Sequence, residues 1–405
     1  MIIKFTKSEF NSLIFIILGG SISIFYFSEI YQELYGLTIL LIYFTIVSVV
    51  NFKAQQISTD FAWSLILFLS IIFFYYLNET TDLALELKDY DKSSNITPAY
   101  IQNILSTAIV VFFIYVIGYV YSFQQTNPLN IFSKILFLQI FAFILNLMWN
   151  FFFLELTSQY SLEIGSLLIF SIPYLLIAIN LKKIKFNQFF LRFDFLLFIL
   201  ITFFLFQLSF RGALLSLIIF VIHYYLYPFF TKRFFLYKLI FFVNIFFIIL
   251  LKYLYLKFYD NIFLAELSMK YFNKSFDSGR PSQWMQLIEI IKDKLIFGHG
   301  HLLQSNYIQS LEYSWISISS HNLYLELLLT GGLIILFLFL ILLYKIWLQM
   351  RSVSENYYGR IGSSILIASF YMISTSQMLL SQNIMINFLF WFFIAVSIGQ
   401  VRKNS

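Results

Sequence analysis

The sequence contains about twelve separate apolar runs, each long enough to cross a bilayer as a helix of roughly 20 residues. The runs lie near residues 11–28, 36–52, 61–77, 101–122, 131–149, 161–180, 193–209, 212–230, 234–256, 322–347, 361–379 and 384–400. Of the 405 residues, 60% are hydrophobic and only 11% are charged, whereas about a quarter of the residues in a soluble domain are charged. This composition excludes a soluble enzyme, a disordered chain and a fibrous repeat, and it predicts an integral membrane protein.

Each run is continuous rather than alternating in polarity, which indicates helices although aromatic residues are frequent. Strands of a membrane barrel would be shorter and would alternate between apolar and polar residues. A strand outside a closed barrel would leave its backbone groups without hydrogen bonds in lipid. We therefore predict an all-α polytopic membrane protein that forms one membrane domain over residues 1–405.

Lysine and arginine are distributed unequally between the connections. With the N-terminus in the cytoplasm, roughly 16 of the 26 fall on the cytoplasmic side, as the positive-inside rule requires. An even number of spans then places both termini in the cytoplasm. This orientation accounts for the net charge of +6 without a nucleic-acid partner. The chain has no cysteine, which excludes disulfides, thiolate nucleophiles and cysteine metal sites.

The longest polar connection, residues 257–321, is predicted to lie on the outer side and to be ordered. Apolar residues inside it follow helical spacing: Trp284, Leu287, Ile288, Ile291 and Leu295. Pro281 suits the first position of a helix, and Gly298 and Gly300 suit its end. We expect a short amphipathic helix that lies along the membrane interface.

Two arginines on the predicted outer side are candidates for binding an anion. Arg280 stands at the start of the amphipathic helix, where free backbone N–H groups and a guanidinium together suit phosphate. The alternative is that Arg280 caps the helix or pairs with Asp277. Arg211 interrupts an apolar stretch and has Gly212 beside it. A charge at such a position usually has a partner or a task, although an arginine can also extend to the headgroups.

A histidine stands where the long connection meets the next span. Ser320 or Asn322 can cap that helix, and His321 would lie near its N-terminus. The helix dipole disfavours an imidazolium there, and a neutral imidazole can accept a proton as a general base. The alternative is that His321 only contributes a polar group at the interface.

These segments resemble the O-antigen ligase and O-antigen polymerase superfamily. The first motif is Ser278-Gly279-Arg280, then Trp284, Ile291-Lys292-Asp293-Lys294 and Phe297-Gly298-His299-Gly300. The second is Ser320-His321-Asn322-Leu323-Tyr324-Leu325-Glu326, followed by Gly331-Gly332. The Arg211-Gly212 pair is similar to an upstream arginine of the family. The resemblance covers residues 205–345.

The resemblance implies a GT-C-like glycosyltransferase of the bacterial inner membrane, with its site facing the periplasm. Such enzymes transfer a glycan from undecaprenyl diphosphate to a hydroxyl acceptor, by inversion and without a metal or other cofactor. His321 would be the general base, and Arg211 and Arg280 would hold the leaving diphosphate. Candidate substrate contacts are Asn322, His299, Glu326, Lys252, Lys257 and Trp284.

The first functional hypothesis is a polymerase of polysaccharide repeat units, for which a chain-length regulator is a candidate partner. The second is a ligase that attaches finished glycan to lipid A–core or to protein. The sequence departs from the ligase pattern after Gly332, where Leu333, Ile334 and Ile335 follow instead of a small or polar residue. The third is a transporter of lipid-linked oligosaccharides, although transporters place their polar sites near the middle of the membrane.

Several candidates have simpler explanations. Asp89-Tyr90-Asp91 could hold a divalent cation, but acidic loops are commonly only solvated. His299 and His301 lack a nearby carboxylate that would complete a metal site. Lys252 and Lys257 can meet phosphate or extend to headgroups, and His223 is expected to pack inside a span.

Overall fold

The computed structural model describes residues 58–86, 99–124, 211–272, 276, 280–299, 322–352, 356–374 and 384–403. Within these ranges the secondary structure is helical and contains no strand. The helices are α3 (Thr59–Glu86), α4 (Ala99–Gln124), α9 (Arg211–Thr231), α10 (Phe234–Phe258), α11 (Ile262–Phe272), α12 (Arg280–Asp293), α14 (Leu323–Gln349), α15 (Tyr357–Ile373) and α16 (Ile384–Lys403). The predicted spans near residues 11–28, 36–52, 131–149, 161–180 and 193–209 lie outside the described residues.

Three stretches in the described part of the chain are long and apolar enough to cross a membrane: Leu214–Thr231, Phe234–Phe258 and Leu323–Gln349. They support the prediction of a helical membrane protein. The total of twelve spans and the GT-C-like arrangement stay predictions. One boundary differs clearly from the sequence-based expectation, because α3 continues to Glu86, beyond the end of the expected run of residues 61–77.

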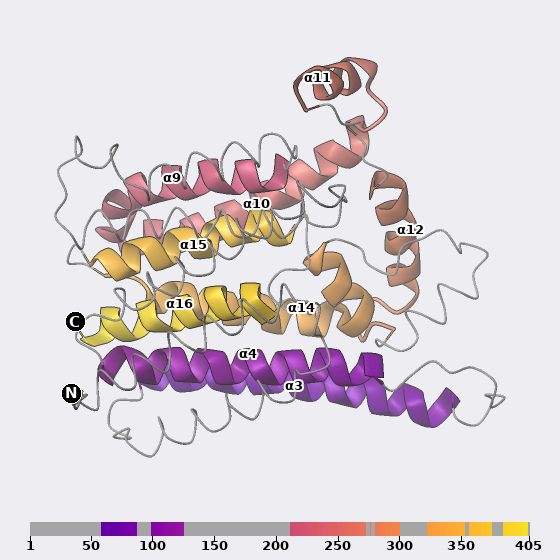
Figure 1. Ribbon diagram of the computed structural model, residues 1–405. Coiled ribbons are helices and arrows are strands. Elements are labelled where there is room, and N and C mark those ends of the chain that lie inside the picture. The colour runs from indigo at the N-terminus through magenta and orange to yellow at the C-terminus, as the bar shows by residue number, and fades with distance from the viewer. Residues whose placement is uncertain are drawn as a thin grey trace, which may run out of the picture.

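The long helices run side by side in one bundle, and α11 and α12 lie at one end of it (Figure 1). Within the bundle, α16 packs on α4, α15 on α9, and the second part of α14 on α3. Small residues permit close approach: a Cβ added at Gly118 of α4 would lie 2.7 Å from the carbonyl oxygen of Phe392. Such close contacts are typical of helices that pack inside membranes.

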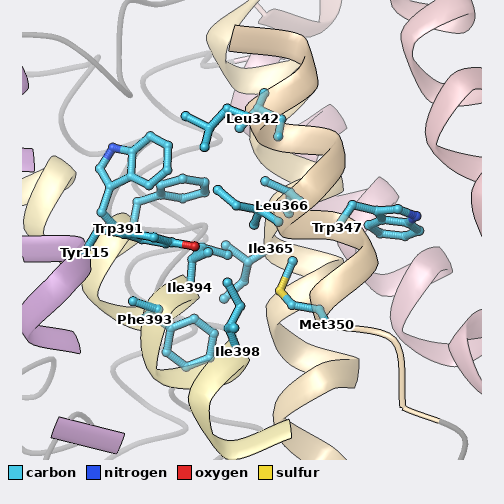
Figure 2. Close-up of a cluster of buried hydrophobic side chains, with 14 of the residues drawn as sticks. Tyr115, Leu342, Trp347, Met350, Ile365, Leu366, Trp391, Phe393, Ile394 and Ile398 are labelled. Carbon is cyan, nitrogen blue, oxygen red and sulfur yellow. The ribbon is translucent and has the colours of Figure 1, made fainter. Parts of the chain in front are cut away.

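Large apolar side chains fill the centre of the bundle. Figure 2 shows Leu342 of α14, Leu366 of α15 and Ile394 of α16 in one buried cluster. At its edge, Tyr237 and Trp347 stack with ring centroids 4.2 Å apart. Each also donates a hydrogen bond to the other's backbone carbonyl, at 2.8 Å from the Tyr237 hydroxyl and 3.0 Å from Trp347 Nε1. This pair fixes α10 against α14.

Helix α14 is kinked at Gly332, whose φ of 63° lies in the left-handed region that favours glycine. The turn that follows α12 docks at this kink. The N–H of Leu333 donates to the carbonyl of Leu295 at 2.9 Å. Gly298, with φ of 74°, approaches so closely that an added Cβ would lie 2.6 Å from the backbone nitrogen of Gly331. Gly298, one of the two glycines predicted to end the helix, therefore also holds the turn after α12 against α14.

Candidate functional site

Helix α12 is the amphipathic helix predicted within the long connection. Its buried face is made by Pro281, Gln283, Trp284, Leu287, Ile290 and Ile291. The predicted face differs at two positions, because Ile288 is only half-buried and Leu295 is exposed. Leu295 leaves the face since α12 ends at Asp293. The buried face is covered by Leu325, Leu328 and Leu329 of α14, and the placement of α12 along a membrane interface stays a prediction.

The two predicted arginines come together at the end of the bundle that carries α11 and α12. Arg211 begins α9 and Arg280 begins α12, and both are half-buried. Burial lowers the pKa of Arg280, the nearby Tyr255 acts in the opposite direction, and the charge of Arg211 lowers it further. Burial also lowers the pKa of Arg211, again against the effect of Tyr255. A guanidinium stays protonated in proteins, so two positive charges are held near each other.

Lys252 on α10 adds a third positive charge. Its Nζ lies 4.4 Å from the centroid of the Trp284 ring, and its charge and that of Arg280 are close enough to repel each other. We refer to Arg211, Lys252 and Arg280 as the cation cluster. Trp284 is 2% exposed, so the protein covers its ring, and Lys252 is among the residues that contact it.

Two residues that we did not single out in the sequence hold the cation cluster in place. Arg211 donates from Nη1 to the Oγ of Ser268 on α11, at 2.8 Å. The Tyr255 hydroxyl donates to the carbonyl of Phe276 at 3.3 Å, and its ring lies 5.8 Å from that of Trp284. Tyr255 follows Lys252 by three residues on α10, so the two side chains share one face of the helix. This spacing is the only feature of the sequence that could have pointed to Tyr255.

Two candidate substrate contacts have structural roles, Asn322 at the start of α14 and His299 after the end of α12. Asn322 is the N-cap, as predicted, and its side-chain oxygen accepts from the N–H groups of Tyr324 at 3.1 Å and Leu325 at 3.4 Å. His299 is buried, with Nε2 2.7 Å from the carbonyl oxygen of Ile290. Contact of either side chain with a substrate stays a prediction.

The remaining candidates are placed as follows. Glu326 is half-buried in the first turn of α14. Lys257 is exposed in the last turn of α10. His223 is buried, as predicted, with Nδ1 3.0 Å from the Oγ of Ser364. His321, His301 and the Asp89-Tyr90-Asp91 pattern lie outside the described residues.

Residues 195–340 match the family model of O-antigen ligases. This segment is similar to the O-antigen ligase family. The matched segment contains all three residues of the cation cluster, and it agrees with the resemblance to the ligase and polymerase superfamily. No curated protein and no solved structure gives a significant match to the chain. The chain is therefore a helical membrane protein that contains a segment similar to O-antigen ligases.

The three cations at one end of the helix bundle make the matched segment suited to binding an anion. Like charges held together in a partly buried site repel one another, and an anion bound between them relieves that repulsion. Groups fixed in this way stabilise negative charge that develops during a reaction. The described residues contain no group of three acidic or histidine side chains arranged to hold a metal ion.

For a transferase that binds its donor at the cation cluster, Ser268→Ala should lower the rate of glycan transfer about 10- to 100-fold, because a hydrogen bond to a charged group is worth about 1.5–3 kcal/mol. The measurement is kcat/KM for a lipid-linked donor with purified protein. Ser268→Thr, which keeps the hydroxyl, should restore the rate. Ser216→Ala is the matched control, since the Ser216 hydroxyl bonds only to Gly212 of its own helix. Equal rates for Ser268→Ala and the unmodified protein would show that this hydrogen bond has no role in positioning Arg211.

Proposed function

We propose that the protein transfers a glycan from undecaprenyl diphosphate to a sugar hydroxyl at the periplasmic face of the bacterial inner membrane, and that it polymerises repeat units of O-antigen, capsule or exopolysaccharide. The observation that carries this proposal is the cation cluster. Arg211 and Arg280 lie far apart in the sequence, yet their charges interact, with Lys252 beside them. A diphosphate is the donor group that matches such a cluster.

The proposed reaction is a single displacement. The acceptor oxygen attacks the anomeric carbon of the donor glycan while His321 takes the hydroxyl proton. A new glycosidic bond forms as the bond between the anomeric carbon and the diphosphate oxygen breaks. Undecaprenyl diphosphate leaves with the electron pair of that bond, and Arg211 and Arg280 stabilise its added negative charge. The anomeric configuration is inverted, and no metal is required.

Two other functions remain as alternatives. A ligase would use the same chemistry with lipid A–core or protein as acceptor, but the residues after Gly332 depart from the ligase pattern. A transporter of lipid-linked oligosaccharide would require polar groups near the middle of the membrane. The cation cluster instead lies at one end of the bundle, beside α11 and α12 (Figure 1).

The deciding experiment supplies purified protein in liposomes with a lipid-linked repeat unit as the only glycan. We expect glycans of several repeats that remain attached to the lipid carrier. Product that appears only after lipid A–core is added would identify a ligase. Movement of intact donor across the bilayer, without a new glycosidic bond, would identify a transporter.

A further inference from the structure

The end of the bundle opposite α12 carries a second group of positive charges. They surround the turn between α9 and α10 and the connection between α14 and α15 (Figure 1). The residues are Lys232, Arg233, Lys238, Arg351 and Arg360. We refer to them as the basic end surface, which plays no part in the proposed transfer reaction.

Two of these cations contact the same aromatic ring. Lys238 Nζ lies 4.1 Å and Arg351 Cζ lies 4.9 Å from the centroid of Phe234, and Phe234 is 48% exposed. Phe234 begins α10, a helix of 25 residues. At 1.5 Å per residue such a helix is longer than the hydrocarbon core of about 30 Å, so its first turn reaches the level of the lipid headgroups.

The arginines of the basic end surface are fixed by hydrogen bonds to backbone carbonyls. Arg351 donates to the carbonyl of Thr231 from Nε at 3.2 Å and from Nη2 at 2.9 Å. Arg360 donates from Nε to the carbonyl of Tyr224 at 2.7 Å, with its guanidinium 3.9 Å from the Tyr224 ring centroid. These arginines are therefore held in place before any ligand arrives, unlike side chains that extend freely to the headgroups.

The neighbouring backbone is fixed as well. The hydroxyl of Tyr227 donates to the carbonyl of Met350 at 2.9 Å and accepts from the N–H of Ser352 at 3.1 Å. This pair of bonds joins α9 to the connection that carries Arg351. The relative positions of Phe234, Lys238 and Arg351 are thus set by the fold.

The charges of this surface are not balanced from within the described part of the chain. No carboxylate in the described part of the chain forms an ion pair with Lys238 or Arg351. Lys238 and Arg351 both lie close to the Phe234 ring, so their like charges repel each other, and each cation–π contact offsets only about 0.5–1 kcal/mol at an exposed site. A phosphate group placed between them would remove this repulsion.

We propose that the basic end surface binds the headgroup of an anionic phospholipid. Lys238 and Arg351 would hold the phosphate, and the exposed apolar residues that follow on α10, Phe235, Leu239 and Phe242, would contact the acyl chains. This surface fits a phospholipid in two ways. Its cations complement the charge of the phosphate, and the apolar face directly beyond them lies where the acyl chains begin.

The proposal is tested by measuring lipid binding to the purified full-length protein in detergent, with phosphatidylglycerol and phosphatidylcholine as probes. We expect the unmodified protein to prefer phosphatidylglycerol. Lys238→Gln should weaken its binding about fivefold, as expected for one charge near a membrane surface, and leave phosphatidylcholine binding unchanged. Lys270→Gln is the matched control, because Lys270 also lies near an aromatic ring, at 5.5 Å from Tyr271, but on α11 at the other end.

A second substitution guards against a folding defect. Phe234→Leu keeps an apolar residue at the start of α10 but removes the ring that both cations contact, and it should also reduce the preference for phosphatidylglycerol. Equal losses in Lys238→Gln and Lys270→Gln would overturn the proposal, since they would indicate a response to net charge alone. Displacement of the lipid by millimolar inorganic phosphate would also overturn it, because the ligand would then be the free ion.

Discussion

Arg280→Ala and Arg211→Ala are each expected to lower the rate of glycan transfer about 10²–10³-fold, the usual effect of removing one group that stabilises developing negative charge. Both guanidiniums would act on the same leaving diphosphate. The double variant should therefore lose less than the product of the two single losses. Arg→Lys at either position should give an intermediate rate, since a lysine keeps the charge but cannot form two parallel hydrogen bonds. The measurement is the transfer rate of purified protein with a lipid-linked donor.

The control for these variants lies on the same helix as Arg280. Lys292 is exposed on α12 and pairs with Glu289 at 2.6 Å, so Lys292→Ala removes a charge without touching the cation cluster. Its transfer rate should stay near that of the unmodified protein. Thermal unfolding separates loss of function from loss of fold. Folded Arg280→Ala protein with full activity would contradict the assignment of the diphosphate to this cluster.

His321→Ala is expected to lower transfer about 10²–10⁴-fold, the range typical for loss of a general base. The reason is that a sugar hydroxyl is a weak nucleophile until its proton is removed. Donor binding should change little, because the arginines proposed to hold the diphosphate remain. The rate and the binding of donor are measured separately with purified protein, and the same rate in the presence of a chelator tests the expected independence from metal.

Asn322→Ser provides the control for the neighbouring helix start. Serine keeps the N-cap of α14 but removes the amide group. If capping is the main role of Asn322, this variant should stay active, and the loss in His321→Ala cannot then be attributed to a disturbed helix. Full transfer by His321→Ala would exclude His321 as the base.

The sequence alone was enough to pick out the charged residues of the candidate site. Arg211, Lys252 and Arg280 stand out in the sequence because charges are rare among apolar spans and costly to place there. The contacts that position them were not predictable. Ser268 meets Arg211 across 57 residues, and that contact depends on how α11 folds back onto α9, which no local periodicity encodes.

The same division applies to the fold. The apolar runs locate α9, α10 and α14 within a few residues, since hydrophobic length is a strong signal in a membrane protein. Helix ends set by polar caps were less predictable: α15 begins at Tyr357, before the expected run at residue 361, because the Asn356 side chain accepts from the N–H of Tyr358. The kink at Gly332 depends on tertiary contacts with the turn after α12, and sequence alone does not reveal those contacts.

The junction between α12 and α14 also has a consequence for the segment that connects them. The N–H of His299 bonds to the carbonyl of Leu329 at 2.7 Å, and Asn322 caps the same helix about two turns earlier. Both ends of the intervening segment, residues 300–321, are therefore fastened to one short piece of α14. Once the ends of a loop are fixed, its length changes the cost of closing it only slowly. Changes in the length of residues 300–321 should therefore leave α12, and with it Arg280, in register with α14.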